Sequence, residues 1–150
     1  MEIEKCDDPA ARELCEAARK AAELAYAKYS EFRVGAAVTT ASGTVYSGAN
    51  VENACYGLGL CAERAAITRA VTSGDRELTR IAVACIDAKQ TDGINASMPC
   101  GACRQWFVEF APDLEVLIWT PGDDIYKFLA RDLLAVPFVL NDPPAAAPGN

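Results

Sequence analysis

The sequence contains no histidine among its 150 residues. Proton transfer near neutral pH therefore has to use carboxylates, thiols or metal-bound water. Positive charge is also scarce, because 14 Lys and Arg residues face 21 Asp and Glu residues, which gives a net charge of −7. Proteins that follow a nucleic-acid backbone usually carry the opposite balance, so we expect no nucleic-acid partner.

Long apolar runs are absent as well. None reaches the length of a membrane span, and the stretch 1–5 does not resemble a signal peptide, so we expect no membrane partner. The seven cysteines are an odd number without the regular spacing of a secreted disulfide framework, which favours the reducing cytoplasm. The length suits one domain, expected over 1–140, followed by a flexible tail rich in proline and alanine over 141–150.

The pattern of apolar residues predicts alternating helices and strands. Helices are expected over 9–28, 61–72, 100–110 and 130–134, and strands over 34–40, from 44 onward, over 80–86, 114–120 and, as an edge strand, 125–128. The first helix should bury a stripe that includes Leu14, Ala21 and Leu24. A hairpin followed by strand–helix–strand–helix–strand predicts an α/β fold, a three-layer α/β/α sandwich with a mixed five-stranded sheet.

Two short stretches carry the residues that metal chemistry needs. One contains Cys61, Glu63 and Arg64, and the other places Cys100 and Cys103 three residues apart, with both sulfurs on one helix face. Three thiolates can hold one tetrahedral zinc ion and leave its fourth position open, as in catalytic sites. A carboxylate two residues after the first ligand can move protons there. Helix N-terminal dipoles would favour the thiolate form of the first cysteine of each stretch.

Other interpretations of the cysteines remain open at this point. Cys100 and Cys103 alone could form a redox pair, and Cys55 could close the zinc site as a fourth, structural ligand. Glu63 argues against the closed site, because a structural zinc has no use for a neighbouring carboxylate. The remaining cysteines fall in helical or strand patterns and are expected to be small core residues: Cys6, Cys15 and Cys85.

A polar loop over 50–59 leads directly into the first metal-binding stretch. It could be a solvated connection. However, its amide and carboxylate side chains, beside a metal site, also suit the neutral hydroxyl groups of a ligand such as a sugar. Phe32, which precedes a predicted strand, is by itself more typical of a core residue than of a ligand contact.

Together these patterns resemble one enzyme family, the small homotetrameric zinc cytidine deaminases of pyrimidine salvage. The resemblance extends from the start of the chain to about Phe138 and rests on these stretches: 29–37, 48–56, 61–64, 99–105 and Leu133-Leu134 with Phe138. It implies hydrolytic deamination of cytidine and deoxycytidine to uridine and deoxyuridine, with release of ammonia.

The resemblance also implies roles for individual residues. Zn²⁺, one ion per chain, would be held by Cys61, Cys100 and Cys103, and zinc-activated water would attack C4 of the cytosine ring. Glu63 would protonate N3 and later carry a proton to the departing ammonia. Arg64 would balance the charge of the thiolates.

The resemblance implies substrate contacts for Phe32, for the polar loop and for Phe138. Phe32 would lie against the base, Asn50 and Glu52 would hold ribose hydroxyls, and Phe138 would enter the pocket of a neighbouring subunit. The residues expected to line the nucleoside site are Phe32, Asn50, Val51, Glu52, Asn53, Ala54, Cys55 and Tyr56. Two alternatives stay open: a deaminase of another cytosine nucleoside such as blasticidin S, and a non-catalytic structural zinc module.

Overall fold

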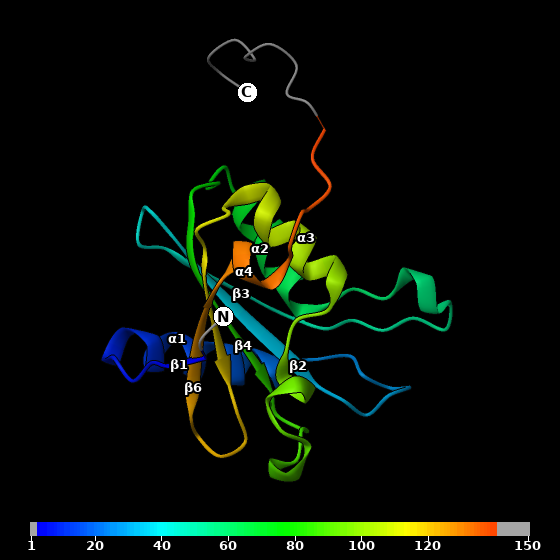
Figure 1. The fold of residues 1–150 in the computed structure, drawn as a ribbon. Coiled ribbons are helices and arrows are strands. Elements are labelled where there is room, and N and C mark those ends of the chain that lie inside the picture. Colours follow the sequence, from blue (N-terminus) through cyan, green and yellow to red (C-terminus); the bar gives the residue numbers. More distant parts are fainter. Residues whose placement is uncertain (1–2, 141–150) are drawn as a thin grey trace.

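The computed structural model describes residues 3–140 (Figure 1), so the tail expected at 141–150 lies outside the described residues. The strands are β1 (Glu4–Lys5), β2 (Val34–Thr40), β3 (Val45–Ala49), β4 (Leu78–Cys85), β5 (Glu115–Trp119) and β6 (Ile125–Leu129). The α-helices are α1 (Pro9–Ala22), α2 (Ala62–Thr72), α3 (Gly101–Phe110) and α4 (Ala130–Leu133). Short 3₁₀ turns are η1 (Tyr56–Leu58), η2 (Gln90–Asp92) and η3 (Ile94–Ser97).

One mixed sheet organises the described chain, with strand order β1-β6-β5-β4-β2-β3. Only β4 and β5 run parallel, joined by the crossover through α3, and the other neighbours are antiparallel. β4 was expected to be a central strand, and its last five residues are all buried, as a strand covered on both faces requires.

The sheet is the middle of three layers. α1 covers one face, and α2 and α3 cover the other, with α4 beside α3 (Figure 1). Two apolar clusters result, one under α1 and a larger one between the sheet and α2, α3 and α4. The three-layer α/β/α fold expected from the sequence is thereby confirmed. None of the described helices combines the length and the apolar character needed to cross a membrane.

The expected strand count was wrong by one, because the sheet in the described residues has six strands instead of five. The additional strand β1 pairs antiparallel with β6, so β6 is not an edge strand either. Two exposed charged residues, Glu4 and Lys5, form β1. A strand of two charged residues shows no alternation of apolar and polar side chains, so it is recognised only by its pairing with β6.

The first helix ends six residues earlier than expected, at Ala22. Leu24, placed on its buried stripe by periodicity, is 85% exposed. Tertiary pairing explains the early end: the Tyr26 N–H donates to the Asn50 carbonyl and the Tyr26 carbonyl accepts from the Glu52 N–H. These backbone groups are therefore used by the polar loop and not by another helical turn.

Two glycines let the helices lie close to the sheet. A Cβ at Gly35 of β2 would lie 1.9 Å from the Ala18 carbonyl oxygen of α1, and a Cβ at Gly48 of β3 would lie 2.6 Å from the Ala66 nitrogen of α2. Real Cβ atoms do not approach other atoms so closely, so larger residues would displace the helices. Gly48 therefore sets the distance between β3 and the helix that carries Glu63.

Candidate functional site

Three thiols meet where α2 and α3 begin. The Sγ atoms of Cys61 and Cys100 are 3.7 Å apart, as are those of Cys100 and Cys103, and all three lie within 4.8 Å of one another. Zinc–sulfur bonds of about 2.3 Å at tetrahedral angles require sulfurs about 3.8 Å apart. The three cysteines therefore fit a zinc ion.

Local structure places each thiol. Cys61 is the N-cap of α2 and Cys100 is the N-cap of α3, and neither N-cap side chain hydrogen-bonds the helix end. Cys103 follows in the first turn of α3 and is fully buried. Unpaired N–H groups at a helix start carry partial positive charge, so both helix ends stabilise the thiolate form that binds metal.

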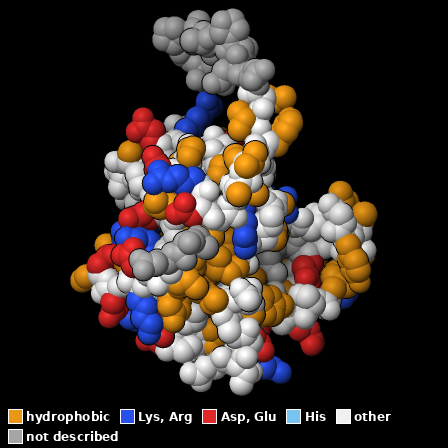
Figure 2. Space-filling view, in the orientation of Figure 1, with side chains coloured by type: hydrophobic (Ala, Val, Ile, Leu, Met, Phe, Trp, Pro, Cys, Tyr) orange, Lys and Arg blue, Asp and Glu red, His pale blue; other side chains and the backbone are white. Residues whose placement is uncertain are grey.

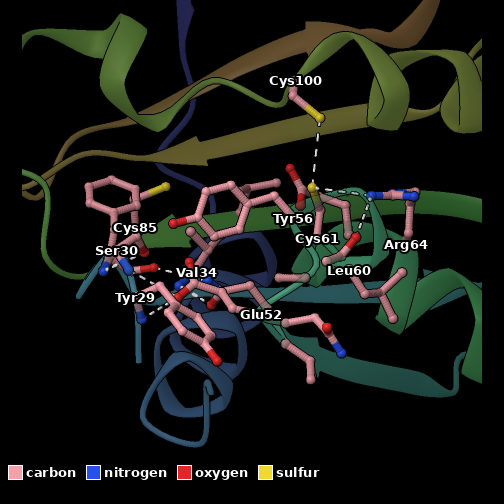
Figure 3. A pocket seen from close by; sticks show the side chains of 18 of the residues that line it. Tyr29, Ser30, Val34, Glu52, Tyr56, Leu60, Cys61, Arg64, Cys85 and Cys100 are labelled. Atoms are coloured by element: carbon pink, nitrogen blue, oxygen red, sulfur yellow. Dashed lines mark hydrogen bonds between the residues drawn. The ribbon is translucent and has the colours of Figure 1, made fainter. Parts of the chain in front are cut away.

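The environment of Cys61 favours that anionic form. Hydrogen bonding with Cys103 is the largest effect that lowers the pKa of Cys61 to about 5, and Arg64 and Cys100 add to it against the cost of burial. The same interaction raises the pKa of Cys103, and burial and the neighbouring negative charges act in the same direction. Arg64 Nη2 lies 3.6 Å from Cys61 Sγ (Figure 3), close enough for a charge-assisted contact to sulfur.

Glu63 is the buried carboxyl group of the site. The residue is only 4% exposed, and burial raises its pKa to about 7, with the neighbouring charge of Cys61 acting in the same direction. A carboxyl group with a pKa near neutrality can both take up and release a proton. The position suits a proton shuttle.

A pocket of about 700 Å³ opens beside the thiols (Figure 3). Its floor includes Glu63 and the end of β4, at Val83 and Cys85. The residues around it come from four regions of the chain: Tyr29, Ser30, Phe32 and Val34; Asn50–Asn53 and Tyr56; Gly59–Arg64; and Ala96, Met98 and Cys100. It is large enough for a small organic ligand such as a nucleoside.

The polar loop already uses part of its hydrogen-bonding capacity inside the protein. Asn50 Oδ1 accepts from the Val34 N–H at 2.8 Å, and Asn50 Nδ2 donates to the Phe32 carbonyl at 2.9 Å. Glu52 Oε1 accepts from the N–H groups of Tyr29 and Ser30. The side-chain hydroxyl of Ser30 lowers the pKa of Glu52 most, and the two backbone N–H groups lower it further. Each side chain keeps at least one further donor or acceptor for a ligand.

Two residues expected to line the nucleoside site lie outside the pocket of this chain, and a third was expected at a neighbouring subunit. Ala54 and Cys55 are exposed and do not line the pocket, and Cys55 is not part of the thiol cluster. Phe138 is 70% exposed, and its carbonyl accepts from Gln105 Nε2 at 2.8 Å. Phe32, Asn50, Val51, Glu52, Asn53 and Tyr56 do line the pocket.

The sequence and the fold of this chain are similar to those of known proteins. A family model described as the cytidine and deoxycytidylate deaminase zinc-binding region matches residues 9–118, which include the three thiols and Glu63. The chain belongs to the cytidine deaminase family. A cytidine deaminase from Halalkalibacterium halodurans is 42% identical over 86% of this chain and 94% of its own length. A probable cytidine deaminase from Dictyostelium discoideum is 42% identical over 89% of this chain and 81% of its own length.

Solved structures from the family have the same fold. The crystal structure of cytidine deaminase from Burkholderia pseudomallei matches 85% of this chain and 98% of its own, with a TM-score of 0.77 and 45% identity. That of the Mycobacterium tuberculosis enzyme covers 89% of this chain and 100% of its own, with a TM-score of 0.72 and 35% identity. The residues matched by the zinc-binding family model include the thiol cluster described above, which could hold a zinc ion.

The sequence did not predict several residues that line the pocket beside the thiols. Cys85 was expected to be a core residue, and it is buried, but its position at the end of β4 also places it on the pocket floor. Ala96 and Met98 come from a stretch for which the sequence predicts no structure. Apolar residues in a polar loop directly before the second metal-binding stretch were the available signal.

Proposed function

We propose that this chain is a hydrolytic deaminase of cytidine and deoxycytidine, acting through the single domain of residues 1–140. One observation carries the proposal: three thiols lie at zinc-binding distances, and two of them, Cys61 and Cys100, line the same pocket as the buried carboxyl group of Glu63. A closed structural site would require a fourth protein ligand, whereas Cys55 lies outside the cluster. The open position and the carboxyl group are what hydrolysis needs.

The chain's own residues supply binding and proton transfer. Zinc, when bound by Cys61, Cys100 and Cys103, supplies a Lewis acid that makes water nucleophilic near neutral pH. Glu63 takes a proton from the attacking water and gives it to N3 of the cytosine ring. Glu63 then moves the hydroxyl proton from C4 to the exocyclic amine, which leaves as ammonia and yields the uracil carbonyl.

The pocket wall gives the nucleoside its orientation. Phe32 packs against the base, and Asn50 and Glu52 use their remaining hydrogen-bonding groups on ribose hydroxyls. An ordinary ribose fits this pair better than the sugar of blasticidin S does, since amide and carboxylate groups pair with vicinal hydroxyls. Arg64 lowers the electron density of the thiolates through its contact with Cys61.

The direct experiment follows the ultraviolet absorbance of cytidine mixed with the purified protein at near-neutral pH. We expect conversion to uridine, loss of that activity with a strong chelator and its recovery with Zn²⁺. Deoxycytidine should also react, and blasticidin S should not. Zinc-loaded protein that leaves cytidine unchanged would contradict the proposal and support the structural zinc module.

We further propose a cytoplasmic homotetramer. The seven cysteines are all free thiols, which fits a reducing compartment. Figure 2 shows apolar side chains gathered on the projecting loop that holds η1 and on the segment before the C-terminal end of the described chain. Leu58 is 69% exposed there, and Val136 is 96% exposed. Patches of this kind mark surfaces that are buried in an assembly.

In such a tetramer Phe138 would reach the pocket of a neighbouring subunit. Sedimentation should show four chains per particle, and Phe138→Ala should raise the KM for cytidine while zinc content stays the same. An active monomer would contradict the assembly, and an unchanged KM would contradict the role of Phe138.

A further inference from the structure

The segment 29–34 carries an aromatic side chain into the pocket without belonging to a helix or, before Val34, to a strand. Glu31 has a left-handed backbone with φ of 56°, which is uncommon for a side chain of this size. Irregular backbone holds one conformation only where other groups satisfy its hydrogen bonds. The question is which groups hold Phe32.

On one side the sheet is continued by a side chain. The ladder of β2 ends at Val34, whose carbonyl accepts from the Asn50 N–H at 3.1 Å. The Asn50 amide then bonds the Val34 N–H and the Phe32 carbonyl, as the backbone of a neighbouring strand would. These two groups lie on the same edge of the extended segment.

On the other edge of the segment, the side chain of Asp87, two residues beyond β4, likewise takes the place of a neighbouring strand. The Arg33 carbonyl still accepts from the Ile86 backbone at 3.2 Å. Asp87 Oδ2 then accepts from the Arg33 N–H at 2.8 Å and from Arg33 Nε at 2.9 Å, while Oδ1 accepts from Arg33 Nη2 at 2.8 Å. One carboxylate therefore binds both the backbone and the side chain of the residue next to Phe32.

This arrangement differs from an ordinary surface ion pair. Exposed pairs contribute little, because two long side chains lose their freedom for one screened contact. Here the Asp87 side chain is 24% exposed, the guanidinium contact has two parallel bonds, and a backbone amide is included. Bidentate geometry to a planar group adds directional precision as well as energy.

We infer that Asp87 is a positioning residue for substrate binding, acting through the backbone of Arg33 on the Phe32 ring. Asp87 is not among the described residues that line the thiol pocket, so a direct contact with substrate does not explain an effect on binding. The inference rests on the proposed function, in which Phe32 packs against the base. Asn50 holds the opposite edge, so loss of Asp87 loosens the segment without releasing it.

The test compares Asp87→Asn with a matched control in zinc-loaded protein. Asp124→Asn removes the charge of a half-exposed carboxylate, which pairs with Lys5 at 2.9 Å and does not line the pocket. Asp87→Asn should raise the KM for cytidine roughly three- to tenfold, with kcat within about twofold of the wild-type value. Amide hydrogen exchange of Arg33 and Val34 without substrate should become faster. The control variant should leave KM, kcat and the hydrogen exchange of these two amides at their wild-type values.

A double variant separates positioning from a general loss of stability. In a Phe32→Ala background, Asp87→Asn should leave KM where Phe32→Ala alone puts it, because no ring remains to be positioned. A full additional rise in KM in that background, or an unchanged KM in Asp87→Asn alone, would overturn the inference. If wild-type protein leaves cytidine unchanged, both the proposed function and this inference are overturned. If wild-type protein is active and Asp87→Asn has the same KM, only the inference is overturned.

Discussion

The helices on the two faces of the sheet begin in different ways. α1 starts at Asp8, whose Oδ1 accepts from the Ala11 N–H at 2.7 Å, followed by Pro9 in the first turn. α2 and α3 start at Cys61 and Cys100, and neither side chain caps the helix. A missing cap costs about 1 kcal/mol of stability. On the face that carries the thiol cluster, the uncapped N-termini of α2 and α3 stabilise thiolates instead.

The two kinds of helix start also differ in what the local charge does. At α1, hydrogen bonds from Cys6 first and then from Ala11 lower the pKa of Asp8, so the carboxylate stabilises the fold. At α2, the pKa of Cys61 is lowered, so the thiolate becomes available to a metal. The N-terminus of α1 therefore contributes to stability, whereas the N-terminus of α2 contributes to metal binding.

The largest effect should come from the first turn of α2. Glu63→Gln keeps the shape of the side chain but can no longer carry protons, so turnover of cytidine should fall by about 10²–10⁴-fold. Zinc content, by metal analysis, and the unfolding midpoint should stay close to wild type. A variant with near-normal turnover would mean that another group moves the protons.

Arg64→Gln should have the next largest effect. It removes the cation 3.6 Å from Cys61 Sγ, and a charge-assisted hydrogen bond contributes about 1.5–3 kcal/mol. Loss of that amount from the transition state would slow turnover roughly ten- to a hundredfold. Steady-state kinetics on zinc-replete protein measure this, with chelator competition as a second readout, in which zinc should be bound less tightly. A normal rate and normal zinc affinity would show that the thiolate charge is balanced elsewhere.

On the opposite face, Asp8→Ala should affect stability and not chemistry. Loss of the cap should lower the free energy of unfolding by about 1 kcal/mol at pH 7, with turnover unchanged. Because the folded pKa lies below that of the unfolded chain, the contribution of Asp8 is present above about pH 4 and is lost as pH falls through the folded pKa. Urea unfolding of wild type and variant should therefore converge under acid conditions. A constant difference down to pH 2 would contradict this assignment.

The smallest effect is expected at Cys55, which lies outside the cluster. Cys55→Ala should retain one zinc ion per chain after dialysis, because Cys55 is exposed and lies apart from the three thiols. Metal analysis beside a Cys103→Ala control, which should lose zinc, measures this. Loss of zinc from Cys55→Ala would restore the closed structural site as an explanation.

Much of the fold and of the metal centre could be predicted from local pattern. The strands β2, β4 and β5 and the helices α2 and α3 follow from apolar runs bounded by glycine, proline and polar residues. The cluster of three cysteines that could hold a metal ion could be predicted, because two of them share a helical turn and the third precedes another helix. These features depend on residues close together in the chain.

The features that sequence reasoning missed depend on distant partners. β1 exists because β6 offers an edge, and α1 ends at Ala22 because the backbone of Tyr26 pairs with the polar loop. The role inferred for Asp87 depends on Arg33, 54 positions earlier in the chain. In each of these pairs, the composition of one segment gives no sign of the distant segment that it contacts.

The sequence by itself determined the chemistry of this protein: three thiols, one carboxylate and one arginine in two short stretches, without any histidine. Only the tertiary structure decided their use. Close approach at Gly48 positions α2, so that Glu63 is buried and its pKa rises to about 7. Desolvation is a property of the packed interior and not of the residue, so the carboxyl group is tuned for proton transfer only when sheet and helix come together.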